Sequence, residues 1–192
     1  MNTKRVSIAV ATTVGALLLT GLSIVAQPQS DEPPEMGFFI TSVGLGDGGN
    51  LGGLAGADAH CQALAEAAGA GHRTWRAYLS TQGNDAVNAR DRIGSGPWAN
   101  AEGLTIATNG ESLHHDNSNV NWEHALDENG AQFESRLGGD PEFTEHDVLT
   151  GTTLVGTAFP AGDDQTCSNW TSNNEGSARV RHPDRISFST PG

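Results

Sequence analysis

The stretch of residues 83–147 constrains the fold most, because it is rich in Asn, Asp and Gly and contains only short apolar segments. These residue types favour turns and loops over long helices or strands. The whole chain has 25 Gly among its 192 residues, and aromatic residues make up only 6% of it. This composition favours a loop-rich fold with short elements over a helical bundle, and it excludes a coiled coil.

Regular elements are predicted mainly on either side of this stretch. Apolar residues recur at helical spacing from Leu54 to Ala68, and Gly69 is well placed to end the helix. Residues 75–80 alternate between apolar and polar side chains, as in a half-buried strand. Further short strands are expected within residues 38–43, 148–155, 166–171 and 179–188. This order of short strands, one main helix and long loops predicts an α+β domain.

Residues 1–26 have the features of an export signal. The basic pair Lys4 and Arg5 precedes an apolar segment, and an abruptly polar, Pro-rich segment follows it. Cleavage is predicted after Ala26. An uncleaved N-terminal anchor is the alternative, because Ile24 stands where a small residue is expected and the apolar segment is just long enough to span a bilayer. We therefore expect a secreted, periplasmic or cell-surface protein.

The remainder of the chain divides into a linker and one domain. Residues 27–36 are acidic and Pro-rich, so they predict a linker that cannot bury apolar surface, whereas residues 37–192 are long enough for one hydrophobic core. The chain carries 23 acidic against 10 basic residues, a net charge of -13, and has no cluster of Lys or Arg. Such a chain repels phosphate backbones, which excludes nucleic acid as a partner. A membrane is a partner only if the N-terminal segment stays uncleaved.

Three groups of residues occur in an order and spacing that a known family shares. They are Gly56-Ala57-Asp58 through Cys61 with Arg73-Thr74-Trp75-Arg76-Ala77-Tyr78-Leu79-Ser80, then Asn88-Ala89-Arg90-Asp91-Arg92-Ile93 with Gly96-Pro97-Trp98, and last Thr166-Cys167-Ser168-Asn169-Trp170-Thr171-Ser172. Together they resemble the endostatin-type branch of the C-type lectin-like fold and bacterial secreted proteins of the same pattern. The resemblance implies a C-type lectin-like domain with short mixed strands, one main helix and long loops.

The cysteines depart from the pattern of this family. The family pairs the helix cysteine, here Cys61, with a cysteine in a final strand, and it pairs the later one, here Cys167, with a cysteine shortly before that strand. The chain contains neither partner, so the last strand of the family is expected to be missing or replaced. Two alternatives stay open for Cys61 and Cys167. They form a disulfide with each other, which needs Cα atoms within about 7 Å, or they are two buried free thiols.

Two oxygen-rich groups in the loops are candidate binding sites. The first matches some ligand offsets of an EF-hand loop, but Trp122 stands where that loop needs a Gly. The second lies where sugar-binding relatives hold calcium, although the ligand triplets of those relatives are absent. The alternative for both groups is solvated turn residues. The candidate calcium ligands of the first group are Asp116, Asn119, Asn121, Asp127 and Glu128, and the candidate ligand-binding residues of the second are Asp163, Asp164, Asn169, Trp170, Asn173 and Asn174.

Three histidines form a weaker candidate site for zinc. His114, His115 and His124 offer imidazole nitrogens, and Asp116 offers a carboxylate. Adjacent histidines on an extended segment point to opposite sides, so only one of His114 and His115 readily binds the same ion. No spacing typical of zinc sites, such as H-E-x-x-H, is present. A polar surface loop is the alternative.

We predict a non-enzymatic, extracellular binding module. Long polar loops on a compact scaffold commonly present binding surfaces, so loops 83–147 and 158–175 are expected to recognise a carbohydrate or a protein surface, with calcium as the candidate cofactor. No G-x-S-x-G elbow or cysteine-nucleophile signature is present, so no catalytic residue is predicted. The alternative functions are a secreted metal-dependent hydrolase with a His/Asp site near residues 114–124, and a degenerate relative without a stable fold.

Overall fold

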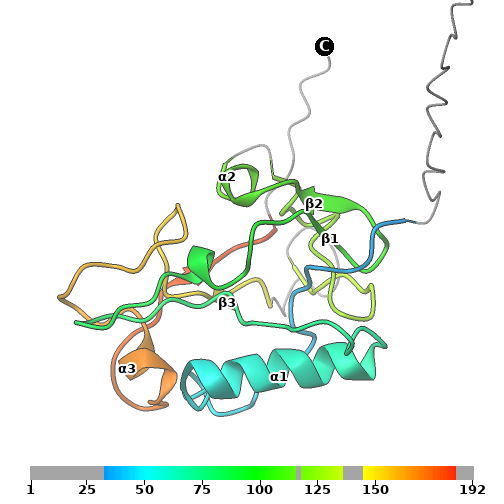
Figure 1. Cartoon of the computed structure of the whole chain (residues 1–192). Coiled ribbons are helices and arrows are strands. Elements are labelled where there is room, and N and C mark those ends of the chain that lie inside the picture. Colours follow the sequence, from blue (N-terminus) through cyan, green and yellow to red (C-terminus); the bar gives the residue numbers. More distant parts are fainter. Residues whose placement is uncertain (1–32, 116–117, 136–144, 185–192) are drawn as a thin grey trace, which may run out of the picture. The chain divides into compact units, whose positions relative to one another are not determined.

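The computed structural model describes residues 33–115, 118–135 and 145–184 (Figure 1). Four predicted features lie outside these residues: the export signal 1–26, the first part of the linker, Asp116, and the end of the last predicted strand. The described residues all belong to one compact unit. They contain a few helices and strands, most of them short, and this mixture agrees with the predicted α+β class. Among them, no helix is both long and apolar enough to cross a membrane.

The main helix, α1 (Gly53–Ala67), confirms the prediction from the apolar spacing. It begins after Gly52, whose φ of 72° lies in the left-handed region that favours glycine. The chain leaves the helix through Gly69, which has a φ of 85°. Its buried face consists of Ala57 and Ala65, whose small side chains let other segments approach closely.

The extended segments pair in short antiparallel ladders. Strand β1 (Trp98–Ala99) pairs with β2 (Thr105–Ala107), and β3 (Val148–Leu149) pairs with β4 (Val180–Arg181). The predicted strand 38–43 is reduced to an isolated bridge of Ile40 with Asp127. Three short helical elements were not predicted from the sequence: η1 (Ala89–Asp91), α2 (Gly110–Leu113) and α3 (Cys167–Trp170).

The predicted strand 75–80 has the expected alternation of burial from Trp75 to Leu79, but Ser80 is also buried, and the segment forms no ladder. Side chains of α1 take the place of a neighbouring strand. The Gln62 amide oxygen accepts a hydrogen bond from the Trp75 N–H at 3.0 Å, and the Asp58 carboxylate accepts one from the Ala77 N–H at 2.9 Å. Because these backbone donors are satisfied by the helix, the segment stays extended without a strand beside it.

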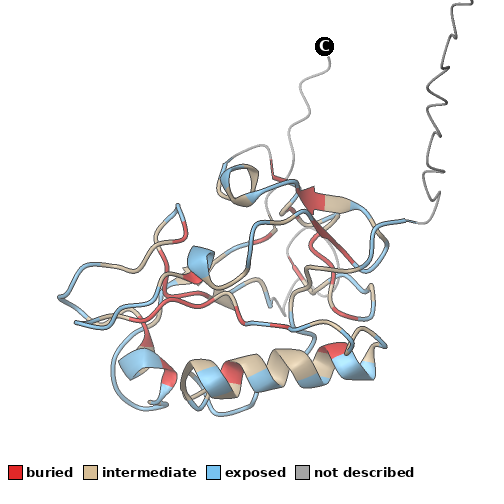
Figure 2. Ribbon diagram, viewed as in Figure 1, coloured by how far each residue is buried: buried red, intermediate tan, exposed pale blue. Residues whose placement is uncertain are grey.

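The core lies between α1, residues 75–80 and α3, where Figure 2 shows buried segments facing one another. Its largest member is Trp170, which is 0% exposed. It packs with Ala57, Ala77 and Leu79. Further buried apolar residues lie in β1 and β2 themselves, namely Trp98, Ala99, Ile106 and Ala107, and in the loop that contains Ala125 and Leu126.

A partly buried ion pair joins α1 to the end of η1 and to the extended segment between them. The Arg92 guanidinium donates to both carboxylate oxygens of Asp58, at 2.7 and 2.8 Å, and it also donates to the Ala77 carbonyl. The Arg92 side chain is 9% exposed and that of Asp58 is 19% exposed. These contacts join residues from the first two of the three groups that resemble the C-type lectin-like family.

Candidate functional site

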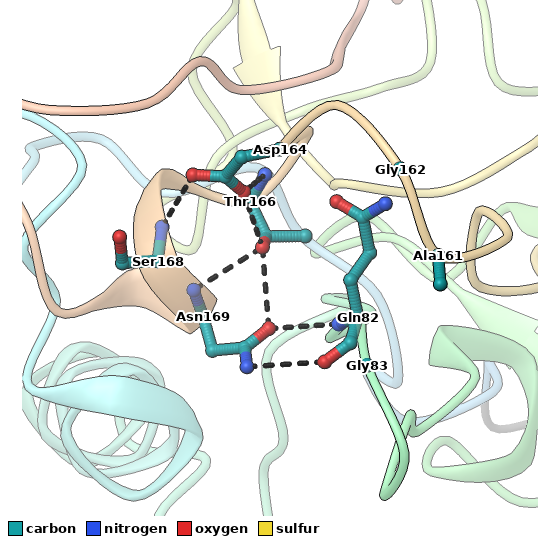
Figure 3. Close-up of a pocket in the computed structure, with 8 residues that line it drawn as sticks. All are labelled: Gln82, Gly83, Ala161, Gly162, Asp164, Thr166, Ser168 and Asn169. Carbon is teal, nitrogen blue, oxygen red and sulfur yellow. Dashed lines mark hydrogen bonds between the residues drawn. The ribbon is translucent and has the colours of Figure 1, made fainter.

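A hollow of about 280 Å³ opens between the end of the extended segment 75–82 and the loop that leads into α3 (Figure 3). Small and polar residues line it, so that space remains for a ligand and hydrogen-bonding groups surround that space. The lining residues are Gln82, Gly83, Ala161, Gly162, Asp164, Thr166, Ser168 and Asn169. The sequence predicted only Asp164 and Asn169 among them.

The element beside this hollow, α3, is a left-handed turn and not the strand that the sequence predicts for residues 166–171. Cys167, Ser168, Asn169 and Trp170 have φ values of 45°, 53°, 58° and 68°. Each non-glycine residue in this region costs about 1 to 2 kcal/mol relative to right-handed backbone. Such strain persists only where surrounding contacts overdetermine the conformation.

Hydrogen bonds from Asp164 and Thr166 supply part of that support. The Asp164 carboxylate accepts from the Ser168 N–H at 2.7 Å, from the Thr166 N–H at 2.8 Å and from the Thr166 hydroxyl at 2.9 Å. Desolvation raises the pKa of Asp164, but these donors lower it by more, so the pKa lies below its ordinary value. The Thr166 hydroxyl also accepts from the Asn169 N–H at 3.1 Å.

Residue Gln82 ties the turn to the opposite wall of the hollow, as the dashed lines of Figure 3 show for its backbone. The Asn169 side chain accepts from the Gln82 N–H at 2.7 Å and donates to the Gln82 carbonyl at 3.2 Å. The Gln82 side chain accepts from the Gln165 N–H and donates to the carbonyls of Pro160 and Asp163. The side-chain amides of both residues thus hold the hollow in shape.

Trp170, a predicted ligand-binding residue, is instead the centre of the core. It is fully buried, and its indole N–H donates to the Ser80 carbonyl at 2.7 Å. An indole in this position anchors the left-handed turn and presents no face to a ligand. The sequence feature that indicates a core position is a large apolar side chain within an otherwise polar loop.

The other predicted residues of this loop lie outside the lining of the hollow. Asp163 is exposed beside it. The Asn173 amide donates to the Asp47 carboxylate, and the Asn174 amide oxygen accepts from the Ser172 hydroxyl at 3.3 Å. Two lining residues that the sequence did not single out shape the hollow: Gln82 acts through partners far along the chain, and Thr166 acts through Asp164 and Asn169 close by.

The predicted calcium ligands are occupied by separate structural contacts. The buried Glu128 carboxylate accepts from the N–H and the hydroxyl of Ser42. Asn121 accepts from the backbone N–H groups of Glu123 and His124. Asp127 accepts from two further N–H groups, and Asn119 donates to the carbonyl of Thr105 at 2.8 Å. Asn121 and Asp127 thus stabilise turns, whereas Glu128 and Asn119 join segments far apart in the sequence; Asp116 lies outside the described residues.

The predicted zinc ligands are likewise not gathered. Both ring nitrogens of His114 are hydrogen-bonded: Nδ1 to the Gly110 carbonyl and Nε2 to the Tyr78 hydroxyl at 2.6 Å. Burial raises the pKa of that hydroxyl to about 12, so it donates to the imidazole at neutral pH. His115 is exposed, and the Nδ1 of His124 is buried without a hydrogen-bond partner. Within the described ranges, no group of three metal-ligating His, Cys, Asp or Glu side chains includes any of these histidines.

Both cysteines are free thiols in this structure, and both are half-buried. Burial, followed by the charge of Asp58, raises the pKa of the Cys61 thiol to about 11. Burial and the charge of Asp164 also raise the pKa of Cys167. Neither thiol is therefore activated as a nucleophile.

Comparison with known proteins finds no protein-family model and no curated protein that matches the chain. The resemblance to C-type lectin-like domains accordingly stays a prediction.

Proposed function

We propose that the protein is an exported binding module of the C-type lectin-like type, which recognises a glycan or a protein surface in the hollow beside α3. The observation that carries this proposal is the left-handed turn at the hollow. Four successive non-glycine residues hold a strained conformation there, and strain of this kind concentrates at ligand clamps and other functional sites.

The walls of the hollow are fixed before a ligand arrives. Trp170 anchors one end of the turn in the core, and the side chains of Asn169 and Gln82 bind the opposite walls to each other. A preorganised site loses little conformational entropy on binding, so even a small hollow can bind a ligand usefully. The exposed Ser168 hydroxyl has no hydrogen bond to a described residue, which leaves it free to bind a polar ligand.

The proposed binding does not use calcium at Asp164. Three donors from the protein already occupy the carboxylate oxygens of this residue, and a Cβ added at Gly176 would collide with its Oδ2, so the carboxylate is closely surrounded. A calcium ion would have to displace these bonds and release the turn. Capture of the ligand is therefore expected to be the same in millimolar calcium and in EDTA.

A variant that fills the hollow tests the proposal without removing any contact that shapes it. Ala161 is exposed and lines the hollow, so Ala161→Trp should block it and abolish capture on glycan and surface-protein arrays. Ala59→Trp, on the exposed face of α1, is the matched control and should capture as the wild type does. Full capture by the Ala161→Trp chain, with the same thermal unfolding midpoint as the control, would exclude this hollow as the binding site.

A further inference from the structure

Four titratable side chains gather at one end of the β3–β4 ladder, away from the sites that the sequence singled out. His146 and Asp147 directly precede β3, whereas His182 directly follows β4 and Asp184 comes two residues later. The antiparallel register pairs Val148 with Arg181. The next position along the ladder brings Asp147 opposite His182, which explains how residues far apart in the sequence meet.

Three of these side chains point their ligand atoms at one another. The distance from His182 Nε2 to Asp147 Oδ1 is 2.7 Å, and the distance from His146 Nε2 to the same oxygen is 3.6 Å. All three atoms lie within 4.8 Å of one another. The two imidazole rings stack with centroids 4.6 Å apart and planes at 11°. Tetrahedral zinc with bonds of about 2.0 to 2.2 Å holds its ligand atoms roughly 3.3 to 3.6 Å apart, so one ring has to rotate out of the stack for both nitrogens to bind one ion.

Asp184 orients one of the two imidazoles. Its Oδ2 lies 2.7 Å from His146 Nδ1, so this nitrogen carries the proton and donates it to the carboxylate. The lone pair of His146 is then on Nε2, which faces Asp147 and His182. A carboxylate behind a histidine in this way is the common partner of metal-binding imidazoles, because it fixes the tautomer and raises the basicity of the ligand.

We propose that His146, Asp147 and His182 bind a zinc ion, with Asp184 as the residue that positions His146. Two imidazole nitrogens and one carboxylate oxygen suit zinc, whereas calcium binds almost entirely through oxygen. In the metal-free chain, His182 Nε2 donates to Asp147, and the zinc ion takes the place of that proton.

The exposure of the group divides it into a fixed and an accessible part. The side chains of His146 and Asp184 are 21% and 17% exposed, whereas those of Asp147 and His182 are 61% and 54% exposed. The ion reaches the site from solvent and keeps one coordination position open to water or to a partner. Three protein ligands with an open fourth position distinguish an exchangeable site from a closed structural one.

Isothermal titration of zinc chloride into the purified full chain, without a histidine tag, tests this proposal. The wild type is expected to bind one equivalent, and His182→Ala and Asp147→Asn to bind none. Asp184→Asn should keep one equivalent but weaken the affinity about 10- to 100-fold, as the loss of an orienting carboxylate does. Cobalt chloride gives a second readout, because its visible absorption bands report nitrogen ligation and should be missing in His182→Ala.

His115→Ala is the matched control, since this exposed histidine lies outside the group and its loss should leave the zinc affinity unchanged. Circular dichroism of each variant shows whether it is folded. If His182→Ala does not fold, Asp147→Asn still tests the site, because it preserves the size of the side chain. The proposal is overturned if the wild type binds no zinc, if His182→Ala or Asp147→Asn still binds it, or if His115→Ala weakens binding as much as they do. Equal affinities of Asp184→Asn and the wild type would refute the positioning role of Asp184.

Discussion

At the scale of single residues, Arg92 shows how much one side chain contributes to this loop-rich fold. It neutralises Asp58 on α1, satisfies the Ala77 carbonyl, and is itself fixed by η1. Asp58 in turn accepts from the Ala77 N–H and from Arg76. A chain with few ladder hydrogen bonds relies on such side-chain contacts to satisfy buried backbone groups.

We predict that Asp58→Asn lowers the free energy of unfolding by about 3 to 5 kcal/mol, because it leaves the Arg92 charge buried without its partner. Urea denaturation of the purified chain measures this change. Asp85→Asn is the control, since Asp85 is exposed and its substitution should alter the stability by less than about 0.5 kcal/mol. Similar urea midpoints for the two variants would show that the Asp58–Arg92 pair is not structurally important.

At the scale of elements, the sequence predicted those parts of the fold that depend on local patterns. The apolar spacing from Leu54 to Ala68 predicted α1, because the helical period determines which residues, three and four positions apart, share the buried face. Residues 75–79 have the predicted alternation of burial, but the segment pairs with no strand, because Asp58 and Gln62 of α1 bind its N–H groups, and no local pattern indicates these contacts. Element type was thus predictable where the hydrogen-bond partners are local.

The left-handed turn α3 is the opposite case. Residues 166–171 have the composition of a strand, yet the turn is held by Gln82, 87 positions before Asn169, and by Ser80, 90 positions before Trp170. Such partners become visible only in the folded chain. The same holds for the zinc group, because His146 and His182 meet only through the register of β3 and β4.

Substitutions at Ser168 test the strain in this turn, since its exposed side chain has no described partner. Ser168→Gly should raise the free energy of unfolding by up to about 1 kcal/mol, because glycine adopts positive φ without a steric penalty, and this gain exceeds its entropy cost. Ser168→Val should lower it by about 1 to 2 kcal/mol, since β-branched residues resist this conformation. Chemical denaturation of both variants measures the two effects.

Ala59→Gly, on the exposed face of α1, is the control for the glycine substitution. There the backbone is right-handed, so glycine should destabilise the chain by about 1 kcal/mol. Opposite signs for Ser168→Gly and Ala59→Gly are therefore expected. If Ser168→Gly destabilised the chain as much as Ala59→Gly, the turn would not carry the strain that supports the proposed binding site.

At the scale of the whole molecule, the chain holds its shape without a covalent cross-link between its described parts. Cys61 packs at the edge of the core that Trp170 fills, but both thiols are free. The cysteine partners of the C-type lectin-like pattern are absent from the sequence. Packing around Trp170 and the Asp58–Arg92 pair join α1 to the segments that follow it.

We predict on this basis that a reducing agent leaves the thermal unfolding midpoint unchanged. A disulfide that closed a loop of this length would contribute about 4 to 5 kcal/mol, so its reduction would lower the midpoint by roughly 10 °C in a domain of this size. Scanning calorimetry with and without dithiothreitol makes the comparison. A large downward shift would mean that Cys61 and Cys167 are bridged in the purified protein.

The labelling rate of Cys61 distinguishes a folded chain from a degenerate relative that has no stable fold. With its pKa raised to about 11, Cys61 has about 100-fold less thiolate at pH 8 than an ordinary cysteine, so iodoacetamide should label it slowly. The labelling rate should rise with pH until about pH 11 in the native chain, whereas in urea it should level off near the ordinary thiol pKa. Mass spectrometry of the Cys61 peptide gives both rates, and equal rates at pH 8 would show that the core around Trp170 does not form.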